Sequence, residues 1–315
     1  MIGIQAIAAY VPAERISNYA SKEQFGIDDA FLENKIGVRS KARKADDQET
    51  SDLCVAAFAA LAAKTGISAG DVDCLLVCTQ NPDGCGLPHT SAIVHSKLGC
   101  SDAVAAFDIS LGCSGFVYSL CTQIALMETH DLQCGLLFTA DPYSKIVDPG
   151  DKNTALLFGD AATVTLLTRR PKLTVEKAAF GTRGSGGEAL VNQGGRLSMN
   201  GRAVFDFSMT SVPPQIQALV AASGRTLADI DLVLLHQGSK YIIDVMTRRL
   251  QLDPARAPSN LAELGNTVSS SIPLLLQGYV DDQSINTILI SGFGVGLSWA
   301  SAILLRHPEE QDESN

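Results

Sequence analysis

Charged and aromatic residues are scarce in this 315-residue chain. Only 18% of the residues are charged and 6% are aromatic, whereas 46% are hydrophobic. This composition excludes a disordered chain and allows a large buried core. Basic residues are fewer than acidic residues: the chain has 24 Lys and Arg and 34 Asp and Glu, which gives a formal net charge of −10. A general nucleic-acid-binding protein would carry a basic footprint, so we expect no nucleic-acid partner.

A CxxC pair is absent, although the chain has eight cysteines. We therefore expect no zinc or other metal site. The N-terminal segment also lacks a basic region followed by a small-residue cleavage site, so we expect no secretory leader. Reduced thiols and a cytoplasmic location follow as expectations, because disulfides persist mainly in oxidising compartments.

Uninterrupted apolar runs long enough for a membrane span are also lacking. Two uncharged stretches, 109–127 and 287–305, approach the length of about 20 residues that a spanning helix needs. Both contain several Gly, Ser or Thr residues, and the second has a glycine-rich break at 292–296. We interpret them as a buried helix and a buried hairpin, and expect no membrane span.

Short apolar runs alternate with amphipathic segments along the chain. The expected strands are 2–9, 74–79, 103–109, 134–140, 161–168, 232–235, 287–291 and 298–305. The expected helices are 51–65, 91–98, 115–130, 208–223, 240–250 and 271–281. This alternation predicts an α/β fold with mostly buried parallel strands.

Three pairs of similar segments recur in the same order in the two halves of the chain. GISAGDVD at 66–73, LGCS at 111–114 and NT at 153–154 are matched by GRTLADID at 224–231, LGNT at 264–267 and NT at 286–287. Ordered self-similarity of this kind indicates a duplicated α/β unit. We predict an N-terminal half at 1–170, a C-terminal half at 171–306 and an acidic surface tail at 307–315.

The repeat indicates where chemistry can occur. In open α/β sheets, ligands bind beyond the carboxyl ends of strands, so two related halves would share one cleft. Cys113 follows a predicted strand at a helix N-terminus, which favours a thiolate. His236 follows another strand, and Asn266 occupies the turn equivalent to that of Cys113. A buried cysteine, a satisfied histidine and a helix N-cap are the alternative interpretations.

The glycine-rich segment SGFGVG at 291–296 resembles a dinucleotide fingerprint only loosely, because it lies between two strands. A turn whose backbone N–H approaches an oxyanion is the better functional interpretation. Two groups of cations stand out, and their alternative interpretation is solvated surface charge. Five cations lie within residues 35–44, beginning with Lys35, and the second group, Lys240, Arg248 and Arg249, follows His236.

Seven motifs in order carry a resemblance to a known family. They are KIGVRSK (35–41), AFDISLGCSGFVYSL (106–120), LFGDAA (157–162), MNGRAVFDF (199–207), LLHQG (234–238), LGNTVSSSIP (264–273) and SGFGVGLSWASAILL (291–305). The chain resembles β-ketoacyl-acyl-carrier-protein synthase III, a condensing enzyme of the thiolase superfamily. The resemblance implies a five-layered αβαβα thiolase-like fold and a homodimer.

The resemblance also implies a catalytic set. Cys113 would take an acyl group from acyl-CoA as a thioester, with backbone N–H groups of Cys113 and of the Gly294–Val295 turn as the oxyanion hole. His236 and Asn266 would hold the malonyl thioester carbonyl while CO2 leaves. A 3-oxoacyl product and CoA would result, as in fatty acid or secondary metabolite biosynthesis.

Further residues are implied as neighbours or contacts of the substrates. Phe293 matches the family's aromatic residue near the nucleophile. Phe31, Lys35 and Lys152 match positions that meet CoA, which enters as a substrate thioester, and no tightly bound cofactor is expected. Three cations match the docking region for an acidic acyl carrier protein: Lys240, Arg248 and Arg249.

Some positions depart from the family's usual pattern. Ser239 replaces an Asn, Phe31 replaces a Trp and Val295 replaces a Gly. These departures favour a specialised relative, and the sequence fixes neither the primer nor the carrier of the malonyl group. An acyltransferase of the same fold, a papain-like hydrolase and a non-catalytic partner subunit are the alternative functions.

Overall fold

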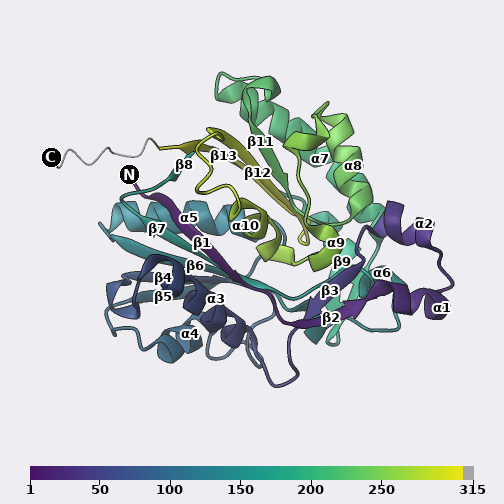
Figure 1. Ribbon diagram of the computed structural model, residues 1–315, viewed down its shortest axis with the longest axis horizontal. Coiled ribbons are helices and arrows are strands. Elements are labelled where there is room, and N and C mark those ends of the chain that lie inside the picture. The colour runs from purple at the N-terminus through teal and green to yellow at the C-terminus, as the bar shows by residue number, and fades with distance from the viewer. Residues whose placement is uncertain (308–315) are drawn as a thin grey trace.

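Nine strands of the chain hydrogen-bond side by side in the order β11-β12-β13-β8-β1-β7-β6-β4-β5 (Figure 1). This computed structural model describes residues 1–307, so most of the predicted tail at 307–315 lies outside the described residues. Both described ends of the chain lie on the same side of the molecule.

The row of strands consists of two sheets that meet at one pair of residues, Ile4 and Leu173. The N-terminal sheet contains β1 (Gly3–Tyr10), β4 (Cys74–Cys78), β5 (Ala105–Ile109), β6 (Cys134–Ala140) and β7 (Ala162–Thr168). The C-terminal sheet contains β8 (Leu173–Thr182), β11 (Leu232–Leu235), β12 (Thr287–Gly294) and β13 (Ser298–Arg306). The connection between β7 and β8 spans residue 170, where we expected the halves to meet.

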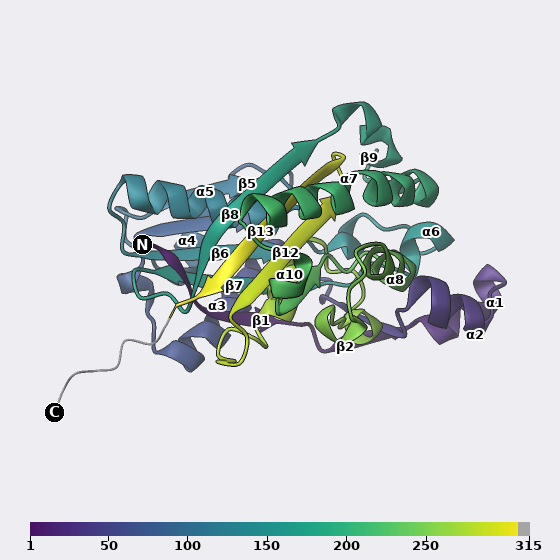
Figure 2. The ribbon, with the colours of Figure 1, turned by 90° about the horizontal axis from the view of Figure 1, so that it is seen from above.

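Helices form three layers with the two sheets between them (Figure 1). The outer layer on the N-terminal sheet holds α3 (Thr50–Thr65) and α4 (Thr90–Leu98). The central layer holds α5 (Gly115–Thr129) and α10 (Ser271–Leu276). The outer layer on the C-terminal sheet holds α7 (Gly201–Ala222) and α8 (Lys240–Arg249), and Figure 2 shows α7 crossing β8, β13 and β12.

Shorter elements gather at the end of the molecule opposite the two termini (Figure 1). They include the antiparallel pair β2 (Glu14–Ser17) and β3 (Ser40–Arg43), and the hairpin of β9 (Leu190–Gln193) and β10 (Arg196–Met199). They also include α1 (Lys22–Phe25), α2 (Asp29–Phe31), α6 (Lys152–Ala155) and α9 (Leu261–Leu264).

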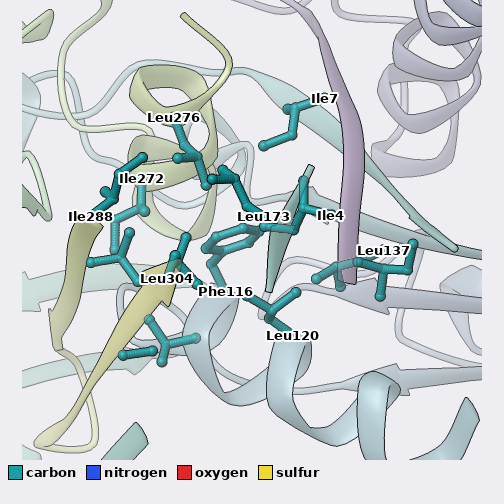
Figure 3. Packing of buried hydrophobic residues seen from close by; sticks show 14 of the residues in the cluster. Ile4, Ile7, Phe116, Leu120, Leu137, Leu173, Ile272, Leu276, Ile288 and Leu304 are labelled. Carbon is teal, nitrogen blue, oxygen red and sulfur yellow. The ribbon is translucent and has the colours of Figure 1, made fainter. Parts of the chain in front are cut away.

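The central layer explains the two uncharged stretches in the sequence. Residues 109–127 contain most of α5, whose Phe116 and Leu120 are fully buried among side chains from both sheets (Figure 3). A helix covered on both sides must be apolar around much of its surface. Residues 287–305 form the antiparallel pair β12 and β13. Among residues 1–307, no helix combines the length and the apolar character needed to cross a membrane.

The first matched pair of segments makes matching contacts, whereas the match of residues 153–154 with 286–287 is wrong, because the former lie in α6 and the latter at the start of β12. Asp73, just before β4, accepts hydrogen bonds from the first backbone N–H groups of the β6 segment, at 2.8 and 3.0 Å. Asp231, just before β11, accepts the same pair of bonds from the β12 segment, at 2.8 and 2.9 Å. Each carboxylate therefore joins neighbouring parallel strands at the end of the sheet far from the predicted cleft.

Several predicted elements differ from the structure. We did not predict β8, because its half-exposed surface carries charged residues at 176–177 and lacks the apolar run used to recognise strands. The predicted helix start at residue 208 is wrong, because the Asn200 side chain caps α7 by accepting the N–H of Ala203. The predicted helix at 271–281 is too long, since α10 ends at Leu276.

Leu120→Ala tests the importance of the central layer. Leu120 has no exposed surface, so the substitution should lower the free energy of unfolding by about 2–5 kcal/mol. Leu87→Ala is the matched control, because Leu87 is 93% exposed and the same truncation should cost less than about 0.5 kcal/mol. Denaturant unfolding of both variants measures the difference, and equal losses would contradict this account of the core.

Candidate active site

A cavity of about 590 Å³ opens where β11, β12 and the residues after β5 meet the short elements. Eight of the predicted site residues line it: Cys113, His236, Asn266, Phe293, Gly294, Phe31, Lys35 and Lys152. Four predicted site residues do not line it: Val295, Lys240, Arg248 and Arg249. The cavity therefore brings residues from both halves of the chain together.

Cys113 lies between β5 and α5 and is buried. β12 approaches it closely because two residues of that strand lack side chains. A Cβ atom on Gly294 would lie 2.8 Å from the Cys113 Sγ atom, and one on Gly292 would lie 2.4 Å from the Cys113 carbonyl oxygen. The backbone N–H groups of Val295 and of Cys113 itself hydrogen-bond to the thiol. Two N–H groups thus converge on the sulfur.

The expected thiolate at Cys113 is wrong, because the buried site favours the neutral thiol. Burial raises the pKa of the thiol to about 12, and the nearby Asp141 carboxylate raises it further. The two backbone N–H groups lower the pKa but do not outweigh burial. α5 begins only at Gly115, and desolvation of the sulfur exceeds the benefit of the helix terminus.

His236 directly follows β11, and its ring forms part of the cavity wall. The Nδ1 atom lies 2.8 Å from the Ser271 hydroxyl, and the ring meets Phe293 edge-on with centroids 5.6 Å apart. Burial lowers the pKa of His236 to about 3, while a hydrogen bond to the Val268 backbone opposes this shift. The imidazole is therefore neutral at pH 7 and has one donor and one acceptor nitrogen.

Asn266 lies in a turn between α9 and α10, so the expected direct strand-to-helix turn is wrong at this position. Its backbone N–H donates to the Leu157 carbonyl at 2.8 Å, which ties the turn to the N-terminal half. Its side-chain oxygen accepts the Val268 N–H at 2.9 Å. Because the oxygen is engaged, the amide NH2 is the group that Asn266 can offer to the cavity.

Cations lie over aromatic rings at the mouth of the cavity. The Lys152 Nζ atom is 5.8 Å from the centre of the Phe31 ring, and the Lys35 Nζ atom is 4.0 Å from that of Tyr241. Tyr241 also stacks on Phe205 with centroids 5.2 Å apart. Sequence reasoning missed both Tyr241 and Phe205. A single aromatic residue on a predicted helix, such as Tyr241, is not distinguishable from a core residue, and Phe205 precedes the predicted helix at 208–223.

The three predicted docking cations lie on α8, outside the cavity. Lys240 forms an ion pair with Asp244 one turn along the helix. Arg248 and Arg249 are exposed, and Arg248 lines a second hollow that shares Lys35 and Tyr241 with the main cavity. Ser239, which replaces the family's Asn, caps α8 by accepting the N–H of Ile242 at 3.3 Å.

The layered arrangement, with a buried cysteine between the halves, defines a thiolase-like α/β fold. Residues 107–184 match the sequence profile of 3-oxoacyl-[acyl-carrier-protein (ACP)] synthase III, and residues 220–306 match that of its C-terminal part. The chain belongs to the 3-oxoacyl-[acyl-carrier-protein] synthase III family and is an acyltransferase.

Similar proteins span nearly the whole chain. The β-ketoacyl-[acyl-carrier-protein] synthase III of Streptococcus pneumoniae (strain Hungary19A-6) is 33% identical over 96% of this chain and 98% of that protein. The solved structure of the synthase III from Thermus thermophilus is 31% identical, with a TM-score of 0.89 over 97% and 99% of the two chains. The priming ketosynthase of the R1128 polyketide pathway shares the fold at 24% identity and a TM-score of 0.87, covering 98% and 97%.

The pKa of Cys113 predicts the pH dependence of its alkylation. With a pKa of about 12, the thiolate fraction rises about tenfold for each pH unit below that value. The rate of iodoacetamide modification at Cys113 should therefore climb through pH 7–10 without a plateau. Peptide-level mass spectrometry measures this rate, and a plateau below about pH 8 would contradict the assigned desolvation.

Proposed function

We propose that this chain catalyses decarboxylative Claisen condensation of an acyl-CoA primer with a malonyl thioester. The observation that carries the proposal is the convergence of Cys113, His236 and Asn266 on one cavity, with two N–H groups at the thiol. Family membership supports the same reaction class. The products are a 3-oxoacyl thioester, CO2 and CoA.

The first step transfers the acyl group to Cys113. The sulfur attacks the thioester carbonyl, its proton leaves, and CoA departs as the C–S bond breaks. The N–H groups of Cys113 and Val295 lie where they can stabilise the oxyanion. A thiol with a pKa of about 12 does not release its proton unaided, and the proton passes to the departing CoA sulfur, so that CoA leaves as a thiol.

The second step forms the carbon–carbon bond. The malonyl thioester carbonyl accepts hydrogen bonds from the Asn266 amide and from His236, which stabilise the enolate as the carboxylate leaves as CO2. The resulting carbanion attacks the acyl-Cys113 carbonyl and expels the sulfur. Burial strengthens both hydrogen bonds, because charge develops in a site of low dielectric constant.

Residues at and beside the cavity mouth are the proposed contacts for CoA and for the carrier protein. Phe31 offers a ring for stacking, and the exposed Lys35 and Lys152 offer charge to phosphates. An acidic acyl carrier protein is the proposed second partner, because the exposed Arg248 of α8 lies in the hollow beside the mouth and would attract it. Arg249 on the same helix is also exposed, and Lys240 is partly neutralised by its ion pair.

A homodimer is proposed from the family resemblance and from the edge strand β5. This strand has one neighbour, β4, in the described sheet, and its first residue, Ala105, is exposed. An acyltransferase without decarboxylation is the second candidate function, since the acyl-Cys113 step is common to both. Release of CO2 from a malonyl thioester discriminates between the two.

Substitutions in the catalytic set should separate the two steps. Cys113→Ala should abolish acylation and condensation, because it removes the sulfur. Asn266→Ala should retain acylation but lower condensation about 10²–10³-fold, because one enolate donor is lost. His236→Ala should spare acylation and lose most of the condensation activity, because the other enolate donor is lost. Intact mass reports acylation, and CO2 release reports condensation; a His236→Ala variant that condenses at the wild-type rate would disprove the assigned role.

Substitution of Phe31 should raise the KM for CoA thioesters and leave the KM for thioesters without a nucleotide unchanged. Loss of one stacking ring costs about 1–3 kcal/mol per base, so Phe31→Ala should raise KM for acyl-CoA about tenfold with little change in kcat. Phe31→Trp is the matched variant and should retain the low KM. N-acetylcysteamine thioesters, which lack the nucleotide, provide the control; an equal effect on them would show that Phe31 does not contact the nucleotide.

A further inference from the structure

Asp141 is a buried carboxylate that the proposed chemistry does not use. It follows β6 and has no exposed surface. Its Oδ1 atom accepts the backbone N–H of Gln80 at 2.7 Å and lies 3.4 Å from the Thr79 hydroxyl. Its Oδ2 atom accepts the hydroxyl of Ser269, whose backbone N–H also bonds to the carboxyl group. These bonds connect the ends of β4 and β6 with a turn of the other half.

The turn that Asp141 contacts comprises residues 266–271 and contains three consecutive serines. Each serine reaches a different partner. Ser269 donates to Asp141, the Ser270 hydroxyl lies 2.8 Å from that of Thr139, and the Ser271 hydroxyl lies 2.8 Å from His236 Nδ1. Two serines therefore fix the turn to the N-terminal sheet, and the third bonds to the proposed catalytic histidine.

The conformation of the 266–271 turn needs this support. Val268 has a φ of 54°, a left-handed conformation that a β-branched residue strongly disfavours. In that conformation its N–H donates to the Asn266 side-chain oxygen and so directs the amide NH2 of Asn266. Local strain of this kind persists only where surrounding contacts over-determine the backbone.

We infer that Asp141 is a positioning residue, which acts through Ser269 to hold the 266–271 turn in place. The turn carries Asn266 and the hydroxyl that bonds to His236, so Asp141 would serve the condensation step; the inference rests on the function proposed above. A carboxylate suits this position because both of its oxygens accept, and the backbone N–H groups that face it can only donate. An Asn side chain would direct its NH2 group toward one of those N–H groups, and two donors cannot form a hydrogen bond with each other.

Direct activation of the thiol is the alternative role for Asp141, and electrostatics oppose it. The negative charge of Asp141 raises the pKa of Cys113 and so disfavours the thiolate. Removal of that charge would not slow attack by the sulfur. The two roles therefore predict different effects on acylation and condensation.

Asp141→Asn and Ser269→Ala test the inference. Displacement of catalytic groups by about 1 Å can cost 10²-fold in rate, so Asp141→Asn should lower the kcat of condensation by about that factor. Formation of the acyl-enzyme should match or exceed the wild-type rate. Ser269→Ala removes one hydroxyl from the same link and should produce the same split, and it keeps the test open if Asp141→Asn does not fold.

The double variant separates positioning from other effects. If Asp141 acts through Ser269, the pair Asp141→Asn with Ser269→Ala should be no slower in condensation than Asp141→Asn alone. Asp73→Asn is the matched control, because Asp73 also joins neighbouring strands through backbone N–H groups but lies at the far end of the sheet. The control should condense at the wild-type rate.

Nuclear magnetic resonance of the His236 ring gives a readout independent of turnover. The ¹⁵N shifts should change in Asp141→Asn and in Ser269→Ala and stay constant in Asp73→Asn, because only the first two move Ser271. Unchanged shifts, fully multiplicative rate losses, or equal losses of acylation and condensation would overturn the inference. If the wild-type protein releases no CO2, the proposed function fails, and the shifts alone decide the role of Asp141.

Discussion

Burial of three polar side chains between two halves of one chain is the constraint on which this structure depends. Desolvation raises the pKa of Cys113 to about 12 and lowers that of His236 to about 3, so both groups are uncharged near pH 7. Asn266 is neutral by nature. These three buried groups carry no charge at neutral pH, and their hydrogen-bond donors act most strongly when negative charge develops on a substrate.

The layered fold supplies this burial. α5 and α10 lie between the two sheets, and Cys113 and Asn266 precede these two helices. β12 contributes Gly294, whose missing side chain lets a strand of the C-terminal half approach a sulfur of the N-terminal half. The carboxyl ends of β11 and β12 place His236 and Phe293 on the same side. The two sheets meet at one pair of residues and lie on either side of the central helices, and residues from both halves line the same cavity.

The fold class and the strands with continuous apolar runs were predictable from the sequence. β8 was not, because a half-exposed strand with Glu176 and Lys177 gives no apolar signal. Motifs located the cavity residues, but the pKa of Cys113 was predicted to shift in the wrong direction. The sequence shows that a helix begins near Cys113, but it does not show that the sulfur is desolvated. Asp141 and Ser271 could not be found from the sequence, because each contacts a residue far away in the chain. Asp141 bonds to Ser269, more than a hundred residues away, and Ser271 bonds to His236, about thirty-five residues away.

The central claim is that Cys113 holds an acyl group which a malonyl thioester then removes by condensation. The most direct measurement is the intact mass of the protein after incubation with acyl-CoAs of increasing chain length, followed by a chase with malonyl-CoA or malonyl-carrier protein. The account predicts a mass gain that the chase removes, together with CO2 and a 3-oxoacyl product. A mass gain that the chase leaves untouched, or no gain with any primer, would contradict it.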